Sequence, residues 1–282
     1  MSADHTIPPA LDAPPSIFAT DGTSFVPSEH ASGPWDARAL HGGAPAALMS
    51  AAFERLQPGA ELPIARLSFE LLRPVPMAPL ILSTEIVRRG RRVQELAGEL
   101  RCEGQLICRA GALRVQAVPA GLPVPPGGVA GPLGVGELPP PEQGTPFRFG
   151  LDDSERASFA SSAMEMRWID DPNKLGPARV WMRLRHPLLP GEPASALARL
   201  AATADFGNGV SAELPFRSFL FINADLSIHL HRAPAGEWIG LDARTLLRAD
   251  GTGLAESVLH DLDGPVGRAF QTLVVQAREG AD

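Results

Sequence analysis

The sequence predicts an α+β fold in which one helix followed by an antiparallel meander is made twice. Three observations support this prediction. The 282 residues divide into halves of similar size, short strings recur between the halves, and the same order of elements recurs with them. A hydrophobic content of 44% is enough for ordinary buried cores, so a disordered or fibrous chain does not fit this composition.

A segment rich in proline and glycine separates the two halves. Residues 119–146 contain nine Pro and seven Gly, and neither a helix nor a central strand survives that density. We therefore predict a flexible tail over 1–17, an N-terminal domain over 18–118, a linker over 119–146 and a C-terminal domain over 147–278.

The internal repeat is weak but consistent. The string Leu67 to Arg73 lies over Leu226 to Arg232 at an offset of 159 residues, and Val115 to Ala117 lies over Val275 to Ala277 at an offset of 160. One residue of slip over this distance is what a duplicated fold with a single insertion would give.

The order of elements supports the duplication. Small apolar residues at helical spacing predict a helix over 44–56, and a second helix is expected over 194–206. Alternating or extended segments predict the strands. In the first half they cover 63–73, 79–89, 92–103 and 106–117; in the second half they cover 219–232, 237–248, 253–262 and 266–277. Further strands are plausible at 23–28, 161–169 and 178–186.

A sheet that curls around a helix in this order is the hotdog fold, and two of them in one chain make a double hotdog. From residue 18 to residue 278 the chain resembles the acyl-CoA thioesterase II family. The resemblance rests on four short motifs in the right order: His41-Gly42-Gly43, Ala204-Asp205-Phe206, the strand from Asn223 to Arg232, and Gln271.

The resemblance implies a reaction and three site residues. In the family an Asp, a Ser or Thr, and a Gln orient a water for attack on a thioester carbonyl. The matching positions are Asp205, Asn223 and Gln271. Asn223 departs from the family pattern because it replaces a hydroxyl residue, although an amide can still donate and accept hydrogen bonds. The implied substrate is an acyl-CoA or a related acyl thioester.

The repeat indicates the same three residues without reference to any family. Subtracting 159 places Asp205 on Ala46 and Asn223 on Ile64, and subtracting 160 places Gln271 on Gly111. A duplicated fold needs its core residues in both copies, whereas a reaction centre needs its polar groups only once. Each residue also has a structural explanation, at a helix end, at a turn or on the outward side of a strand.

We expect Asp205 to act as the general base, with Asn223 and Gln271 holding the water. Free amides after His41 would stabilise the oxyanion, because the first turn of a helix presents unpaired N–H groups. Gly42 and Gly43 would let the substrate approach the backbone. No metal or redox cofactor is required, since a thioester is already an activated acyl donor.

Two other functions remain open at this stage. A non-catalytic protein that binds acyl thioesters would keep the pocket and lose the water-holding groups, and the Asn223 departure leaves room for it. An enoyl-CoA hydratase would carry an Asp followed five residues later by a His. Here Asp225 precedes His229 by four residues and His231 by six, so that pattern is missing.

Composition limits the partners and the location. A formal charge of −7 gives no basic excess for a phosphate backbone, so nucleic acid is not expected. His229 and His231 alternate onto one strand face, but no third metal ligand is evident. No signal peptide or membrane-spanning segment is recognisable, which predicts a cytoplasmic protein, and a homodimer is the preferred assembly.

Overall fold

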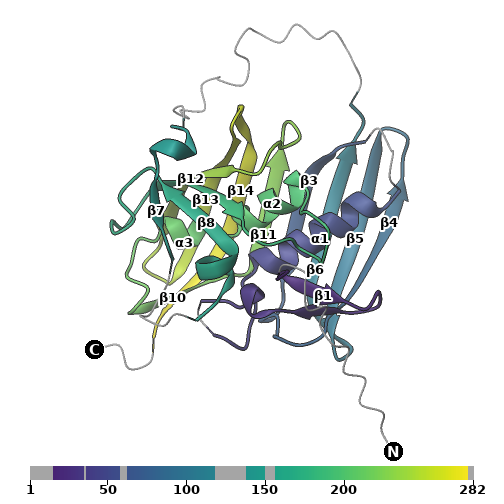
Figure 1. Ribbon diagram of the computed structural model, residues 1–282, viewed down its shortest axis with the longest axis horizontal. Helices are drawn as coiled ribbons and strands as arrows, with labels where there is room; N and C mark the ends of the chain where they lie inside the picture. Colours follow the sequence, from purple (N-terminus) through teal and green to yellow (C-terminus); the bar gives the residue numbers. More distant parts are fainter. Residues whose placement is uncertain (1–14, 35, 58–61, 118–137, 150–155, 279–282) are drawn as a thin grey trace, which may run out of the picture.

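The computed structural model describes residues 15–34, 36–57, 62–117, 138–149 and 156–278. Most strands belong to one 12-stranded sheet, and two central helices lie side by side against it (Figure 1). The first half contains β1 (Phe18–Thr20), β2 (Phe25–Pro27), α1 (Gly43–Arg55), β3 (Ile64–Leu71), β4 (Ile81–Arg89), β5 (Val93–Cys102) and β6 (Gln105–Val115). The second half contains β7 (Thr145–Phe147), β8 (Met164–Trp168), β9 (Ala178–Leu184), α2 (Ala196–Ala204), α3 (Gly207–Val210), β10 (Phe219–Asn223), β11 (Asp225–Leu230), β12 (Ile239–Leu247), β13 (Thr252–Asp261) and β14 (Gly264–Ala277).

The strand order of the large sheet reads the same from both sides of its centre. It runs β4-β5-β6-β3 and then β11-β14-β13-β12, with β9, β8 and β7 beyond, and β10 pairs with β14. Each half thus contains a central helix and four strands in the same order. The halves join where β3 pairs with β11. This arrangement confirms the predicted α+β double hotdog.

An approximate two-fold axis passes through the join. Ser68 of β3 pairs with Ser227 of β11, and these two residues are 159 positions apart. Ser68 also pairs with Gly111, whereas Ser227 pairs with Phe270. Gly111 therefore corresponds to Phe270, and the counterpart of Gln271 is Ala112. The pairing of Gln271 with Gly111 expected from the sequence is wrong by one residue, because the strands keep the offset of 159 throughout.

The two helices are antiparallel and very close. An added Cβ on Gly43 would lie 2.5 Å from the carbonyl oxygen of Ala202, so the start of α1 lies against the end of α2. At the other end, the Ser195 hydroxyl before α2 donates to the Glu54 carboxylate in the last turn of α1. Small residues make this approach possible, as the predicted small-residue helix face requires.

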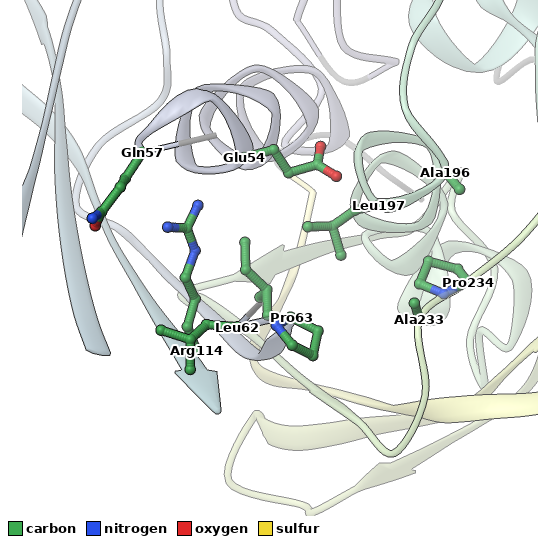
Figure 2. A pocket seen from close by; sticks show the side chains of 10 residues that line it. Glu54, Gln57, Leu62, Pro63, Arg114, Ala196, Leu197, Ala233 and Pro234 are labelled. Carbon is green, nitrogen blue, oxygen red and sulfur yellow. The ribbon is translucent and has the colours of Figure 1, made fainter. Parts of the chain in front are cut away.

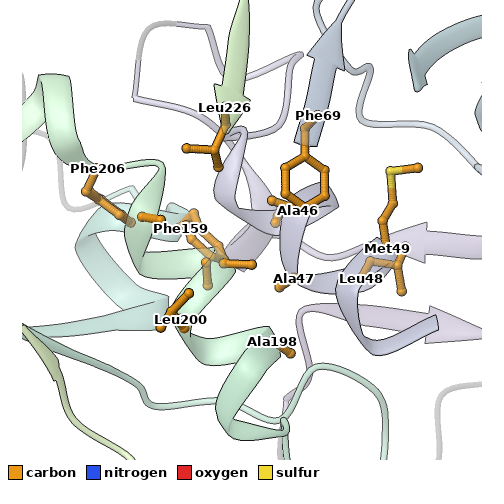
Figure 3. Packing of buried hydrophobic residues seen from close by; sticks show 14 of the residues in the cluster. Ala46, Ala47, Leu48, Met49, Phe69, Phe159, Ala198, Leu200, Phe206 and Leu226 are labelled. Atoms are coloured by element: carbon orange, nitrogen blue, oxygen red, sulfur yellow. The ribbon is translucent and has the colours of Figure 1, made fainter. Parts of the chain in front are cut away.

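The core is continuous across both halves. Phe69 of β3 and Leu226 of β11 are cross-strand partners, and both side chains reach toward α1 (Figure 3). Ala46 and Ala47 of α1 lie beneath them in the same cluster. A smaller buried cluster forms around Phe221 in the second half. Among the residues that the structure describes, no helix has the length and apolar character needed to cross a membrane.

The strand predicted over 219–232 is interrupted. Asn223 pairs with Leu273, but Ser227 pairs with Phe270, so one extra residue, Ala224, lies between β10 and β11. A bulge of this kind bends a strand and redirects the neighbouring side chains. The first half has a register shift at the equivalent place, between Ile64 and Arg66. The interruption is therefore a property of the duplicated fold.

Part of the predicted linker and tail packs against the folded domains. Trp181 donates its indole N–H to the Pro139 carbonyl oxygen at 2.6 Å, and Leu138 is buried. Ile17 is also buried, with its N–H on the Pro187 carbonyl oxygen. The remaining linker residues, 119–137, and tail residues 1–14 lie outside the described residues.

The buried His260 of β13 predicts a pH-dependent stability. Burial lowers the pKa of this imidazole from 6.5 to about 4. The unfolded chain takes up the proton near pH 6.5, whereas the folded chain excludes it until about pH 4. The free energy of unfolding therefore carries no penalty from His260 above pH 6.5, and it should decrease by roughly 3 kcal/mol as the pH falls to 4.

Urea unfolding at pH 7 and pH 4 measures this loss. We expect His260→Gln to lose clearly less stability between the two pH values than the native chain. The matched control is His229→Gln, because His229 is exposed on β11, and this variant should follow the native chain. Equal losses in His260→Gln and the native chain would contradict the prediction.

Candidate functional site

The three residues predicted to be catalytic meet at one carboxylate. Asp205 directly follows α2, Asn223 ends β10, and Gln271 lies within β14. The Asn223 Nδ2 donates to Asp205 Oδ1 at 2.7 Å. The Gln271 Nε2 lies 3.4 Å from the same oxygen and donates to the Asp205 backbone carbonyl at 3.0 Å. Residues from one helix end and two strands thus surround the Asp205 side chain.

The residues of the site differ in burial. Asp205 is 5% exposed and Gln271 is 1% exposed, whereas Asn223 is only partly buried. His41 and Gly42 are also partly exposed. Asn223 and the start of α1 are therefore the more exposed parts of the site.

Gln271 is held at both ends of its amide. Its Oε1 accepts the Asn208 backbone N–H at 3.0 Å, while its Nε2 is committed to Asp205. Gly207 makes room for this contact, because an added Cβ would lie 2.9 Å from Gln271 Oε1 and 2.7 Å from the Ser257 hydroxyl. The amide of Gln271 therefore fixes the Asp205 side chain rather than facing the more exposed parts of the site.

The predicted binding residue His41 contacts the same carboxylate. Its Nδ1 lies 3.0 Å from Asp205 Oδ2. The imidazole stacks on two phenyl rings, with centroid distances of 4.2 Å to Phe206 and 5.1 Å to Phe159. Stacking sets the plane of the ring, so Nδ1 is held toward Asp205.

The Nδ1 atom of His41 has two neighbours, one of which requires it to accept a hydrogen bond and the other to donate one. The Gly43 backbone N–H donates to Nδ1 at 3.0 Å, which requires a bare nitrogen. A bond to an ionised Asp205 requires a proton on Nδ1 instead. Nδ1 can therefore satisfy only one of these two neighbours at a time.

Gly42 packs directly on the carboxylate. An added Cβ would lie 2.7 and 2.9 Å from the two oxygens of Asp205, although its backbone angles of −59° and −26° suit any residue. The described residues supply no acceptor for its N–H. The Gly42 amide is thus a donor beside the candidate base that has no partner among the described residues. The Gly43 amide is free only when His41 releases it.

Sequence reasoning missed the residues that support this site. Phe159 and Phe206 orient His41, while Gly207 and Asn208 hold Gln271. The string Phe206-Gly207-Asn208-Gly209 carried a signal, because a glycine-rich turn directly after the candidate base allows close backbone approach. Phe159 precedes β8 in a one-turn π-helix and gave no local signal.

The expected pairing of Asp205 with Ala46 is wrong, because Ala46 lies in the first turn of α1 whereas Asp205 directly follows α2. The carboxylate in the last turn of α1 is Glu54. Asp205 ends α2 and faces the start of α1, whereas Glu54 ends α1 and contacts Ser195 at the start of α2. Their numbers differ by 151, not by the 159 of the strands. The chain between helix and strand is longer in the second half, where α3 is inserted.

Solved structures with this architecture come from several bacteria. A conserved protein of unknown function with hot dog fold from Alicyclobacillus acidocaldarius matches with a TM-score of 0.69 and 17% identity, over 93% of this chain and 96% of that one. An acyl-CoA thioesterase II, TesB2, from Mycobacterium marinum matches with a TM-score of 0.62 and 19% identity, over 84% and 90%. A tesB protein from Mycobacterium avium subspecies paratuberculosis matches with a TM-score of 0.60 and 18% identity, over 92% and 96%. At these identities the matches establish the fold.

Models of protein families match the sequence in both halves of the chain. Residues 31–115 match the acyl-CoA thioesterase N-terminal domain, and residues 138–275 match the acyl-CoA thioesterase C-terminal domain. Comparison with curated protein sequences gives no significant match. The two domain models occur in tandem and together span most of the chain. The chain therefore belongs to the acyl-CoA thioesterase family and is a thioester hydrolase.

Proposed function

We propose that the chain hydrolyses an acyl-CoA to a free acid and CoA by attack of a water held between Asp205 and Asn223. One observation carries this proposal: the buried carboxylate of Asp205 receives the Asn223 amide at 2.7 Å, and the Asn223 side of this carboxylate is only partly buried. A general base must lie within hydrogen-bond reach of the proton that it removes. A water on this side meets that requirement.

Each residue has a distinct role in the reaction. Asp205 accepts a proton as the water oxygen bonds to the thioester carbon. The carbon–sulfur bond then breaks, and the proton passes from Asp205 to the leaving CoA sulfur. Asn223 accepts a hydrogen bond through its Oδ1 from the second O–H of the water, which stays on the attacking oxygen, because the Asn223 Nδ2 is already bonded to Asp205. Gln271 acts as a positioning residue through its two contacts with Asp205.

The start of α1 supplies donors for the oxyanion. The Gly42 N–H has no acceptor within the described part of the chain, and helix N-termini favour negative charge. A protonated His41 Nδ1 would bond the ionised Asp205 and leave the Gly43 N–H free for the same oxyanion. In this way a hydrogen bond from His41 to Asp205 would add a second donor for the oxyanion.

The first test of the site is thiol release from acyl-CoA substrates of short, medium and long chain length. Asp205→Asn keeps the shape and removes the base, so we expect kcat to fall about a hundredfold or more. In Asn223→Leu we expect kcat to fall by at least about tenfold, since this change removes the acceptor for the second O–H of the water. Asn223→Ser should keep more activity than Asn223→Leu, because a hydroxyl can still bond the water.

Controls separate this mechanism from its alternatives. Asp263→Asn makes the same change at an exposed position and should leave kcat unchanged. Equal turnover by Asp205→Asn and the native chain would overturn the assignment of the base. Binding of acyl-CoA without thiol release would favour an acyl-thioester binding protein, and consumption of an enoyl-CoA without thiol release would favour a hydratase.

A substitution at Gly42 tests the geometry without touching a polar group. The added methyl of Gly42→Ala would lie within 3 Å of both Asp205 oxygens, so the carboxylate must move away from the water. We expect kcat to fall about tenfold or more with an unchanged circular dichroism spectrum. The matched control is Gly209→Ala, because an added Cβ there meets nothing within 4 Å. Full activity in Gly42→Ala would show that the carboxylate position is not critical.

A further inference from the structure

A cavity lies at the opposite end of the helix pair from Asp205. It has a volume of about 290 Å³ and opens between the end of α1 and the start of α2 (Figure 2). Three of its residues are polar: Glu54, Gln57 and Arg114. The rest of the lining is apolar and comes from Leu62, Pro63, Ile64, Ala196, Leu197, Ala233 and Pro234.

The two-fold axis relates this cavity to the candidate active site. With the strand offset of 159, Ile64 corresponds to Asn223 and Arg114 corresponds to Leu273. Glu54 takes the place of Asp205 at the helix end, as described above. The amides of Asn223 and Gln271 are therefore replaced at the other end by the apolar residues Ile64 and Ala112, and the apolar Leu273 is replaced by Arg114. This composition suits binding rather than hydrolysis.

Arg114 brings a buried positive charge with a free donor. The residue is 4% exposed, and its Nη2 donates to the Phe53 carbonyl oxygen at 2.7 Å. Its Nη1 has no partner within the described residues. In Figure 2 the guanidinium lies between Glu54 and Gln57, beneath the last turn of α1. An unpaired buried donor of this kind is costly unless a ligand or water completes it.

The start of α2 adds further donors to the same wall. The Ser195 hydroxyl accepts the Ala198 N–H, but the N–H groups of Ala196 and Leu197 have no acceptor in the described part of the chain. Both residues line the cavity. Backbone donors at a helix start and a guanidinium together favour a negatively charged group.

The size and charge of the cavity limit the kinds of anion that can bind there. Glu54 faces the same space, so a doubly charged phosphate would meet a second negative group. A single carboxylate can bond Arg114 with less repulsion, and an apolar body would fit against Leu62, Ile64 and Leu197. A volume near 300 Å³ lies at the small end of ligand sites.

We propose that this cavity is a second ligand site, which binds a short-chain aliphatic monocarboxylate with its carboxylate on Arg114. The apolar body lies along Leu62, Ile64 and Leu197. This inference does not depend on the proposed hydrolysis, because binding can be measured without any turnover.

The test is calorimetric titration of the full chain with hexanoate at pH 7. Two comparison ligands are used: hexanol has the same alkyl chain without the charge, and inorganic phosphate has a charge without the alkyl chain. We expect hexanoate to bind at least about tenfold more tightly than either one. Arg114→Met should weaken hexanoate binding about tenfold or more. Glu54→Gln should tighten it by about fivefold, because the opposing charge is removed while the acceptor for Ser195 is kept.

Two variants make the site assignment specific. Ala233→Trp fills the cavity from an exposed loop position, so it should abolish hexanoate binding with the fold intact, even if Arg114→Met does not fold. Asp205→Asn should leave the binding unchanged, because Asp205 belongs to the other end of the helix pair. Hexanoate that binds no better than hexanol, or binding that Ala233→Trp leaves intact, would overturn the proposal. Loss of binding in Asp205→Asn would place hexanoate in the candidate active site and would equally overturn it.

Discussion

The close contact between the start of α1 and the end of α2 is the constraint on which the candidate site depends. Gly43 approaches the Ala202 carbonyl and Gly42 approaches the Asp205 carboxylate at distances that leave no room for a Cβ. The positive end of the α1 dipole therefore lies directly against a buried negative charge. Within the described residues no Lys or Arg forms a salt bridge with Asp205. The groups placed to stabilise a negative charge on this carboxylate are therefore His41 and the backbone dipoles.

The two-fold axis explains why a carboxylate occurs at each end of the helix pair and only one end is equipped for the proposed hydrolysis. The backbone is repeated closely, down to the bulge after Asn223 and its equivalent after Ile64. The side chains have diverged. Two amides hold Asp205, whereas Glu54 is held by one hydroxyl and shares its cavity with Arg114. Duplication thus supplies two equivalent positions, and each can acquire its own chemistry.

Sequence patterns were sufficient for the elements and for part of the site. Helical spacing and strand alternation are local, so α1, α2 and the eight meander strands were predictable. The contrast between Asn223 and Ile64 was readable because the strand offset is constant. The counterpart of Asp205 was not readable, because α3 lengthens the chain between helix and strand. The rings that stack on His41 come from distant segments, and only the fold brings them together.

The replacement of a hydroxyl by Asn223 changes how a water would be held. A hydroxyl has one proton, which must go either to Asp205 or to the water. The Asn223 amide separates these functions, because Nδ2 bonds Asp205 at 2.7 Å and Oδ1 remains as an acceptor. A water that donates one proton to Asp205 and the other to Asn223 keeps its lone pairs for the thioester carbon. The amide is therefore compatible with the proposed general-base hydrolysis, in which it would fix the orientation of the water more strictly than a rotating hydroxyl.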